Sequence, residues 1–426
     1  MNYLQTLDYM YRQLPMYQRQ GTVALKKDLG NIVALMDAMG DPHTMFKSIH
    51  IAGTNGKGTT AHIIAAGLQA NGLRVGMYTS PHYIDFRERI KINGTFIGKE
   101  EVVLFVQKYK YLFEKIRPSF FEMTVAMAFY YFAEQDVDIA IIEVGLGGRL
   151  DSTNIITPLL SIITNISYDH QAMLGDTLEE IAWEKAGIMK NGIDTIKGET
   201  QSDIEKIFTE KKNRVGCELY NADSYTTLKP VENGYAVDIN HKLWIKKLNT
   251  NLTSTVQKKN LITALYSLHR LQNQLGLLPD KIAEGITNMS NLTYYIGRYQ
   301  VLQERPFVLA DSAHNIAGVQ ELLSHMQNYA YKSLHVVLGM VNDKDISKVL
   351  KLLPNTATYH FVKADIPRGM PTEKLQEIAN GHGLIGECHS SVFEGYNRSL
   401  SLAKSEDMVL VMGSIFVVAE VLASTV

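Results

Sequence analysis

The chain has 426 residues, 46% of them hydrophobic, which is enough to bury a sizeable core and to form two or three domains. Its formal net charge of −2 lacks the positive excess of nucleic-acid-binding proteins, and its two cysteines have no CxxC spacing, which excludes a disulfide framework and a cysteine zinc site. The first residues are polar and aromatic and no run of about 18 apolar residues occurs, so we expect a cytoplasmic protein with no signal peptide, membrane span or nucleic-acid partner.

The first half of the chain alternates helices with apolar strands. In chain order the predicted elements are a helix at 31–39, a strand at 46–53, a helix at 60–72, a strand at 74–80, a helix at 123–135, and strands at 137–145 and 159–167. The strand, glycine loop, helix and strand between residues 46 and 80 form a βαβ unit, and the last two strands are continuous apolar runs typical of buried parallel strands. The pattern predicts a doubly wound, mostly parallel sheet.

The second half changes character twice. Residues 215–255 alternate short polar and apolar runs around turns, which predicts a small antiparallel sheet, and residues 257–274 predict a helix. A second α/β pattern follows, with strands within 306–315, 333–345 and 356–365, and a last strand and helix at 407–422. We therefore predict two α/β domains. Residues 1–296 form a doubly wound P-loop domain with the small antiparallel sheet, and residues 297–426 form a smaller Rossmann-like domain.

The stretch GTNGKGTT at residues 53–60 resembles a phosphate-binding loop. Its glycines allow backbone N–H groups to point inward, Lys57 supplies a positive charge, and a helix starting near Thr59 adds its N-terminal dipole. Gly58 takes the place where the usual loop has its hydroxyl residue. Glycine-rich turns between a strand and a helix are common, but a lysine between two glycines in this setting favours phosphate binding.

Three polar residues come at the ends of predicted strands, where α/β sheets place their ligands. Glu143 ends an apolar strand, where a carboxylate is costly unless it is paired or bound to metal, and it resembles the acidic residue of a Walker B strand. Ser80 and His170 also follow strands, although Ser80 is equally compatible with a turn and a lone histidine is more often structural. Together the three predict a shared metal site. The charged run at 87–89 is equally compatible with a solvated surface.

Lys185 and three polar residues of the second domain complete the candidates. Lys185 lies in the apolar stretch IAWEKAGIMK, where most lysines extend to solvent, and its spacing alone indicates nothing more. Arg298 lies at the predicted domain junction, where it is well placed to reach a phosphate. Asp311 and His314 follow a strand of the second domain.

Taken in order, these motifs resemble the folylpolyglutamate synthase and dihydrofolate synthase family, which belongs to the Mur ligases, ATP-dependent amide ligases. The resemblance spans essentially the whole chain. It rests on GTNGKG (53–58), YTSPH (78–82), ERI and ING (88–94), FFEMT (120–124), EVGLGGRLDSTN (143–154), DHQ (169–171), EKAGI (184–188), GR (297–298), D-x-AHN (311–315), GMVNDKD (339–345), IPRGMP (366–371) and MGSIFVVAEVL (412–422).

The resemblance implies an enzyme that uses ATP and two Mg²⁺ ions to join L-glutamate to a folate or pteroate carboxylate, through an acyl phosphate, with release of ADP and phosphate. It implies that Lys57, Lys185 and His314 take part in catalysis and that Lys185 is carbamylated and holds the second Mg²⁺, while Ser80, Glu143 and His170 surround the first. The implied ATP contacts are Gly53, Thr54, Asn55, Gly56, Lys57, Gly58, Thr59, Asn260, Arg298 and Asp311. The implied pterin-side residues are Phe121, Glu122, Met123, Thr124 and Asp151. We expect a monomer.

Several positions depart from the family pattern. The family's G-x-H-Q is replaced by the sequence STVQ at 254–257, the P-G-R motif begins with Ile296, the H-N-P motif ends with Ile316, and the early G-L-x-R motif lacks its arginine at Ile32. These changes bear on substrate preference and lie outside the predicted magnesium residues. Two alternatives follow: a divergent Mur-type ligase with another acceptor, and a P-loop protein that binds nucleotide without catalysis. Lys185 in its EKAGI setting argues against the second, since a mere binder has no evident need for a second metal ligand.

Overall fold

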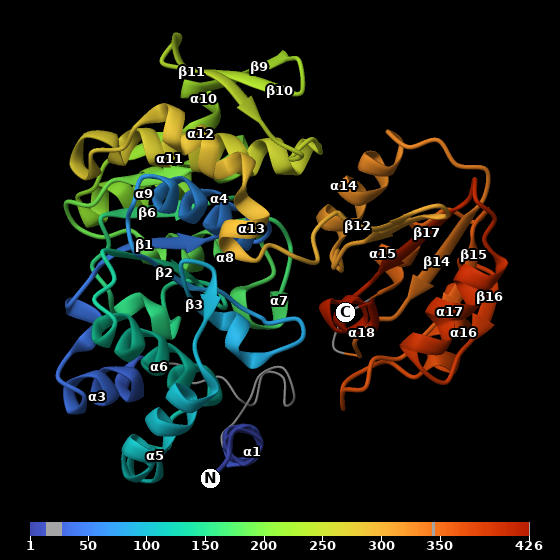
Figure 1. Cartoon of the computed structure of the whole chain (residues 1–426), viewed down its shortest axis with the longest axis horizontal. Coiled ribbons are helices and arrows are strands. Elements are labelled where there is room, and N and C mark those ends of the chain that lie inside the picture. The colour runs from blue at the N-terminus through green and yellow to red at the C-terminus, as the bar shows by residue number, and fades with distance from the viewer. Residues whose placement is uncertain (14–27, 343–345, 426) are drawn as a thin grey trace. The chain divides into compact units, whose positions relative to one another are not determined.

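The computed structural model of the chain describes residues 1–13, 28–342 and 346–425 (Figure 1). Contacts divide it into two units, which we call unit 1 (Met1–His82 with Arg87–Tyr295) and unit 2 (Tyr83–Phe86 with Ile296–Val426). The chain therefore passes between the units at three points, after His82, after Phe86 and after Tyr295. The last three residues of the GMVNDKD motif lie outside the described residues.

Unit 1 is built on an eight-stranded sheet with the order β4-β3-β2-β5-β1-β6-β7-β8. Its strands are β1 (Lys47–Ala52), β2 (Val75–Tyr78), β3 (Ile90–Ile92), β4 (Thr95–Phe96), β5 (Ile139–Glu143), β6 (Leu160–Ile163), β7 (Thr195–Lys197) and β8 (Leu219–Asn221). The six neighbouring strands β2-β5-β1-β6-β7-β8 pair in parallel. At one edge β3 pairs antiparallel with β2, and β4 pairs antiparallel with β3. The predicted doubly wound, mostly parallel sheet is confirmed.

A second, three-stranded sheet is antiparallel, as predicted, but smaller than the sequence indicates. It consists of β9 (Thr226–Val231), β10 (Gly234–Ile239) and β11 (Lys242–Asn249) in the order β11-β10-β9. The start of the predicted region is different, because β8 pairs in parallel with β7 and extends the large sheet. Three residues are too short a run for their pairing partner to be read from sequence.

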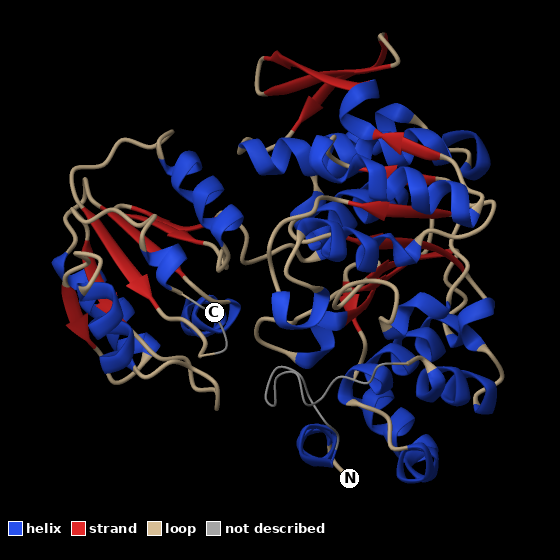
Figure 2. Ribbon diagram, turned by 180° about the vertical axis from the view of Figure 1, so that it is seen from behind, coloured by secondary structure: helices blue, strands red, loops and turns tan. Residues whose placement is uncertain are grey.

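Helices cover both faces of the large sheet in unit 1 (Figure 2). Those that matter for the site are α4 (Lys57–Ala70), α6 (Phe120–Glu134), α8 (Leu178–Lys185), α11 (Thr255–Leu275), α12 (Pro279–Thr287) and α13 (Met289–Thr293). The others are α1 (Tyr3–Gln13), α3 (Gly30–Ala38), α5 (Lys99–Ile116), α7 (Gln171–Leu174), α9 (Glu205–Val215) and α10 (Ala222–Tyr225).

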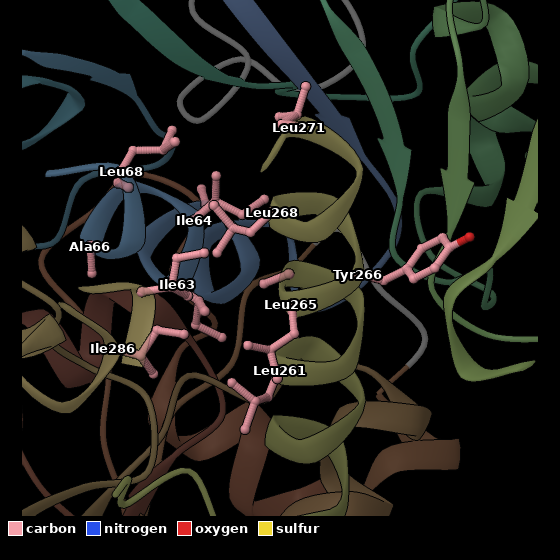
Figure 3. Close-up of a cluster of buried hydrophobic side chains, with 14 of the residues drawn as sticks. Ile63, Ile64, Ala66, Leu68, Leu261, Leu265, Tyr266, Leu268, Leu271 and Ile286 are labelled. Atoms are coloured by element: carbon pink, nitrogen blue, oxygen red, sulfur yellow. The ribbon is translucent and has the colours of Figure 1, made fainter. Parts of the chain in front are cut away.

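Helix α4 is buried on all sides, because the sheet lies beneath it and α11 lies above it. Ile63, Ile64 and Leu68 of α4 face leucines of α11, including Leu265 and Leu268 (Figure 3). The residues of α4 from Thr59 to Leu68 are all buried, as expected of a helix inside a core. This packing fixes the helix that carries the phosphate-binding loop.

Unit 2 is a six-stranded sheet with the order β12-β13-β17-β14-β15-β16, parallel except at β12. Its residues alternate between two apolar layers, one under α14 to α16 and the other under α17 and α18. The strands are β12 (Gln300–Glu304), β13 (Phe307–Ala310), β14 (Leu334–Leu338), β15 (Thr358–Phe361), β16 (Gly386–Cys388) and β17 (Met408–Met412); the helices are α14 (Ile316–Met326), α15 (Ser347–Leu350), α16 (Thr372–Asn380), α17 (Val392–Leu402) and α18 (Ile415–Thr425). The second α/β pattern is confirmed. Among the described residues, none of the helices is both long and apolar enough to cross a bilayer.

Candidate active site

The predicted residues of unit 1 come together because the carboxyl ends of the central strands are level. Strand β1 lies between β5 and β6, and the register aligns Ile51 with Glu143 and Ala52 with Ile163. The loops that follow these strands therefore leave the sheet at one edge, on both sides of β1, where the strand order reverses. Open α/β sheets bind their ligands at such a point.

The loop at residues 53–59 is tied to the segment that follows β6. Asn165 accepts the backbone N–H of Thr54 through its carbonyl oxygen, at 2.9 Å, and the N–H of Asn55 through its side-chain oxygen, at 3.0 Å. Thr164 donates its hydroxyl to the carbonyl oxygen of Asn55 at 2.6 Å. Both residues lie in the predicted strand at 159–167, but no motif singled them out. Their bonds fix the loop before any ligand arrives.

Two of the loop's three glycines are required by its geometry. Gly53 and Gly56 have φ angles of 143° and 82°, which L side chains rarely adopt. A Cβ at Gly53 would overlap the hydroxyl of Thr164, and a Cβ at Gly56 would overlap the side chain of Asn260. Asn260, which is 4% exposed on α11, thus lies directly against the loop. The structure brings this predicted ATP contact to the predicted ATP loop.

Helix α4 begins at Lys57, two residues before the predicted start, because Gly56 in the left-handed region serves as its N-cap. The first N–H groups of a helix have no acceptor within it, so the backbone of Lys57, Gly58 and Thr59 presents donors at the end of the loop. The Lys57 ammonium donates to the carbonyl oxygens of Gly53 at 3.1 Å and Thr54 at 3.2 Å, so the side chain folds over the loop.

Glu143 is a buried carboxylate next to the phosphate-binding loop. It is 5% exposed, and its Oε2 accepts the backbone N–H of Ser80 at 3.1 Å. A Cβ at Gly58 would lie 3.7 Å from the same oxygen, so the glycine after Lys57 places the loop close to this carboxylate. The structure thus brings together two of the three predicted metal ligands, Glu143 and Ser80.

The donor set fits a hard divalent cation. Carboxylate and hydroxyl oxygens are the ligands that Mg²⁺ prefers, and it is usually held by one or two carboxylates together with substrate phosphates. The described residues contain no group of three or more His, Cys, Asp or Glu side chains that could hold a metal ion by themselves. His170, in the left-handed region at φ 51°, has its Nε2 3.8 Å from Oδ2 of Asp169. Its part in a metal site stays a prediction.

Lys185 does not extend to solvent. It is 4% exposed, and its Nζ donates to the carbonyl oxygen of Gly53 at 2.9 Å, so it lies under the phosphate-binding loop. Burial, with a further contribution from the positive charge of Lys57, lowers the pKa of Lys185 to about 7. A substantial fraction of this lysine is therefore an uncharged amine at neutral pH. The solvent-exposed alternative is wrong.

The glycine-rich loop after β5 interlocks with the end of α8. A Cβ at Gly148 would lie 2.8 Å from the carbonyl oxygens of Glu184 and Lys185, and a Cβ at Gly187 would overlap the backbone of Arg149. The backbone N–H of Arg149 donates to the carbonyl oxygen of Glu184 at 2.8 Å. The backbones of the EVGLGGRLDSTN and EKAGI motifs are therefore in direct contact, and this contact positions Lys185.

Asp151 organises the same loop from within. Its Oδ2 accepts the backbone N–H of Leu146 at 2.9 Å, and its Oδ1 accepts the N–H of Thr153 at 3.0 Å and its hydroxyl at 2.5 Å. Burial raises the pKa of Asp151, although these hydrogen bonds oppose the shift. These bonds give Asp151 a structural role in the loop. Its predicted contact with the pterin stays a prediction.

The predicted pterin-side residues of the FFEMT motif differ in exposure. Glu122 is buried and completes a capping box at the start of α6, where it accepts the N–H of Ser119 at 2.5 Å. Met123 and Thr124 are fully buried. Phe121 is exposed in part, and a Cβ at Gly145 would lie 2.5 Å from its ring. Of the four, Phe121 has the exposure that contact with an acceptor requires.

The charged run after Ser80 is not a solvated surface. Glu88 is 6% exposed and Arg89 is 2% exposed, and the Nε of Arg89 donates to Nδ1 of His82 at 2.8 Å. Nearby Lys91, which no motif indicated, is also buried, and burial lowers its pKa to about 8 while the carboxylates of Glu88 and Glu143 oppose the shift. The ERI segment therefore supplies buried charge close to Glu143.

In unit 2 the three predicted residues lie in one small network. Asp311 is 4% exposed and accepts the N–H groups of Tyr299 at 2.9 Å and Ala313 at 2.8 Å. Burial raises its pKa, against the opposing charge of Arg298. The Nη1 of Arg298 donates to the hydroxyl of Ser312, and Nδ1 of His314 lies 3.0 Å from the Ser312 carbonyl oxygen.

Comparison with known proteins agrees with this geometry. A Mur ligase middle domain model matches residues 51–268, and a Mur ligase glutamate ligase domain model matches residues 297–415. Fold, loop and matched domains together define an ATP-dependent ligase of the Mur class.

Individual relatives show which family of Mur ligases the chain resembles. The dihydrofolate synthase/folylpolyglutamate synthase of Bacillus subtilis is 32% identical over 418 residues, which cover 93% of this chain and 94% of that protein. The Escherichia coli protein of the same name is 32% identical over 376 residues, 87% of this chain and 85% of that one. The chain spans only 50% of a Haloferax volcanii relative named for folylpolyglutamate synthase and dihydropteroate synthase, to which it is 32% identical. The chain belongs to the folylpolyglutamate synthase/dihydrofolate synthase family.

Solved structures support the assignment. Escherichia coli FolC in complex with DHPP and ADP superimposes with a TM-score of 0.86 at 27% identity, covering 100% of this chain and 97% of that one. The bifunctional enzyme of Yersinia pestis complexed with AMPPNP and Mn superimposes with a TM-score of 0.86 at 28% identity, covering 100% and 98%. A further structure of a bifunctional synthase holds Mn, AMPPNP and L-glutamate.

Proposed function

We propose that this chain joins L-glutamate to the carboxylate of a folate or pteroate and converts ATP to ADP and phosphate in the process. The observation that carries the proposal is the position of Lys185, whose amine lies under the phosphate-binding loop at 2.9 Å from the Gly53 carbonyl oxygen. In this proposal residues 1–296 bind ATP, residues 297–426 form the glutamate ligase domain, and the enzyme acts as a cytoplasmic monomer.

The reaction needs two steps. An oxygen of the acceptor carboxylate attacks the γ-phosphorus of ATP, the bond to the β-phosphate oxygen breaks, and ADP leaves. The amine of L-glutamate then attacks the carbonyl carbon of the acyl phosphate, the nitrogen loses a proton, and phosphate leaves from the tetrahedral intermediate. The acyl phosphate reacts readily with water, so the enzyme must exclude water while the intermediate exists.

The first step asks the protein for positioning and charge rather than covalent chemistry. Lys57 and the first N–H groups of α4 bind the phosphates, and Arg298 supplies a further positive charge. His314, with Nδ1 directed to the Ser312 carbonyl oxygen, keeps Nε2 as an acceptor in its neutral form, which suits a role at the acyl phosphate or in orienting the loop. Asn260, packed on Gly56, and Asp311 complete the proposed ATP contacts.

We propose that Ser80, Glu143 and His170 hold one Mg²⁺ and that modified Lys185 holds a second. Such ions neutralise the phosphate oxygens and bring the two anionic substrates together. Manganese in the structures of related synthases supports divalent metal binding at this kind of site. Glu143 and Ser80 are the best supported part of this set, because the Ser80 backbone N–H donates to Oε2 of Glu143 and so holds the two residues together.

Lys185 has the chemistry that carbamylation requires. The lone pair of its neutral amine attacks carbon dioxide, the nitrogen loses one proton, and the product is a carbamate whose single negative charge is shared by two oxygens. A pKa of about 7 makes the neutral amine available at physiological pH, which an exposed lysine near 10.4 does not do. The carbamate converts a buried cation into a ligand for the second ion.

The two alternatives make different predictions in one assay. ADP release is measured with L-glutamate and either dihydropteroate or tetrahydrofolate as the acceptor. We expect release that depends on both glutamate and acceptor. If ADP is released with another carboxylate but with neither dihydropteroate nor tetrahydrofolate, the chain is a divergent Mur-type ligase. If the chain binds ADP but shows no turnover with any acceptor, it is a P-loop protein without catalysis.

A further inference from the structure

The last residues of unit 1 are held by the helix that begins at the phosphate-binding loop. Thr59 and His62 lie three positions apart on α4, so their side chains share one face. Thr293, the last residue of α13, and Tyr295 lie against that face. Unit 1 ends at Tyr295, and the proposed ATP contact Arg298 follows three residues later.

Hydrogen bonds give this contact a direction. The Thr293 hydroxyl donates to the carbonyl oxygen of Met289 at 2.7 Å, so it accepts the bond from Nδ1 of His62, also at 2.7 Å. His62 is 7% exposed, and burial holds its pKa well below its usual range. The ring is therefore neutral with its proton on Nδ1. Its edge meets the ring of Tyr295, with centroids 5.2 Å apart and planes at 61°.

The hydroxyl of Tyr295 then reaches the loop itself. It lies 3.0 Å from the hydroxyl oxygen of Thr59, which is 7% exposed. When Tyr295 donates to Thr59, the proton of Thr59 is free to point to another acceptor, and each bond of such a chain strengthens the next. Thr59 lies in the first turn of α4, where a phosphate oxygen is the acceptor that the loop is built to receive.

We propose that Tyr295 is a positioning residue that orients the Thr59 hydroxyl toward a bound nucleotide phosphate and thereby couples nucleotide binding to the chain segment leading to Arg298. The inference rests on the proposed nucleotide site. It deepens that proposal by adding a residue that lies outside the loop and outside every motif quoted for the family. In the absence of nucleotide the same contact keeps the segment on α4, and nucleotide binding stabilises it further.

The first test compares Tyr295→Phe with Tyr294→Phe. Tyr295→Phe removes one hydroxyl and leaves the ring on His62, so we expect it to fold. Tyr294, which is 39% exposed and packs on Phe96, provides the same chemical change one residue earlier. We expect calorimetric titration with ADP and Mg²⁺ to give a Kd raised about two- to tenfold in Tyr295→Phe, the effect of one hydrogen bond, and unchanged in Tyr294→Phe.

The second test measures coupling directly. Hydrogen exchange of the peptide covering residues 289–298 is followed with and without ADP. We expect ADP to slow exchange in the wild type and in Tyr294→Phe, and to slow it much less in Tyr295→Phe, an outcome that general loss of stability does not produce.

The outcomes separate the two proposals. A wild-type chain that binds no ADP contradicts the proposed function. A wild-type chain that binds ADP, together with a Tyr295→Phe variant of equal affinity or equal ADP-dependent protection, overturns the role of Tyr295 alone. A Tyr295→Phe variant with weakened binding and a Tyr294→Phe variant weakened to the same extent would also overturn it.

Discussion

Lys185 is the residue whose chemistry depends most on its surroundings. Replacing it with Ala removes the amine that forms the carbamate, so we expect glutamate-dependent ADP release to be lost. Added acetate or formate should restore part of the activity, because a free carboxylate can occupy the space of the carbamate. The matched control is Lys211→Ala, which removes a lysine of α9 whose ammonium lies over the Trp183 ring. Unchanged activity in Lys185→Ala would remove the carbamate from the mechanism.

Replacing Glu143 tests the proposed metal site. Glu143→Ala removes the buried carboxylate beside Gly58, and we expect magnesium-dependent turnover to fall by at least about 100-fold, the usual scale for losing a group that stabilises charge in the transition state. We expect the fold to persist, although the variant removes the acceptor of the Ser80 N–H. Turnover as a function of Mg²⁺ concentration, with circular dichroism as the control for folding, decides the matter. A fully active variant excludes Glu143 as a metal ligand.

At the residue scale, sequence reveals the residues that depart from their surroundings. Lys57 and Glu143 can be singled out without a structure. A charged side chain between glycines or at the end of an apolar strand costs free energy unless it binds a ligand or an opposite charge. Asn165, Lys91 and Tyr295 are not visible in this way. Their positions come from packing between segments as distant as Thr59 and Tyr295, and the residue type at these places does not reveal its contacts.

The contact between the glycine-rich loop and α8 makes a prediction for whole elements. Gly187→Ala would place a Cβ against the Arg149 backbone, which cannot yield as a side-chain end does. We expect the free energy of unfolding to fall by about 1–3 kcal/mol, as for other overpacked sites, and activity to fall because Lys185 shifts. Urea unfolding measures the first effect and ADP release the second.

The control for this prediction is Gly381→Ala in unit 2. Gly381 has a right-handed helical conformation, with φ −62°, and a Cβ there would come no closer than 3.3 Å to the carbonyl oxygen of Ile378. We expect little change in stability at this position. If Gly187→Ala is as stable and active as Gly381→Ala, close backbone contact does not hold the glycine-rich loop against the end of α8.

Elements with strong apolar periodicity are those that the sequence predicts well. β1, β5, β6 and α11 are long or wholly apolar, and each lies where the pattern indicates. β4 and β8 are two and three residues long, and their place in the sheet is decided by their neighbours rather than by their own residues. The start of α4 differs from the predicted one because its N-cap is a left-handed glycine and not a Ser, Thr, Asp or Asn.

At the scale of the whole molecule, the chain's three passages between the units lie close in sequence to residues proposed to bind metal or phosphate. The first and second surround Tyr83–Phe86, which follows Ser80 closely in sequence, and the hydroxyl of Tyr83 donates to the Gly297 carbonyl oxygen at 2.9 Å within unit 2. The third lies between Tyr295 and Arg298. Residues proposed to bind metal and phosphate in unit 1 are thus only a few residues from segments that belong to unit 2. Contacts of this kind are invisible in a linear motif, so the sequence placed the boundary near residue 296 and missed the segment at 83–86.

Unit 2 also contains a buried cluster of three histidines beneath α17, two from the adjacent strands β14 and β15 and one that follows β16. His360 on β15 lies 3.1 Å from His389 and 3.5 Å from His335 on β14, measured between ring nitrogens. Burial and the two neighbouring rings lower the pKa of His360 to about 4, and burial lowers that of His335. The charged groups that act on the cluster are Asp407, which opposes the shift at His335, and Glu387 and Arg398, which act in opposite directions at His360.

The lowered pKa values predict that the protein loses stability in mild acid. Between the unfolded value of about 6.5 and the folded value of about 4, the unfolded chain binds more protons, so the stabilisation is complete above about pH 6.5 and is lost as pH falls toward 4. For His360 the loss is on the order of 2–3 kcal/mol. Thermal unfolding at pH 7 and pH 5 should therefore show a smaller difference in His360→Gln than in wild type, while His241→Asn, on an exposed turn, should match wild type. If His360→Gln keeps the full wild-type difference, the acid sensitivity does not come from this cluster.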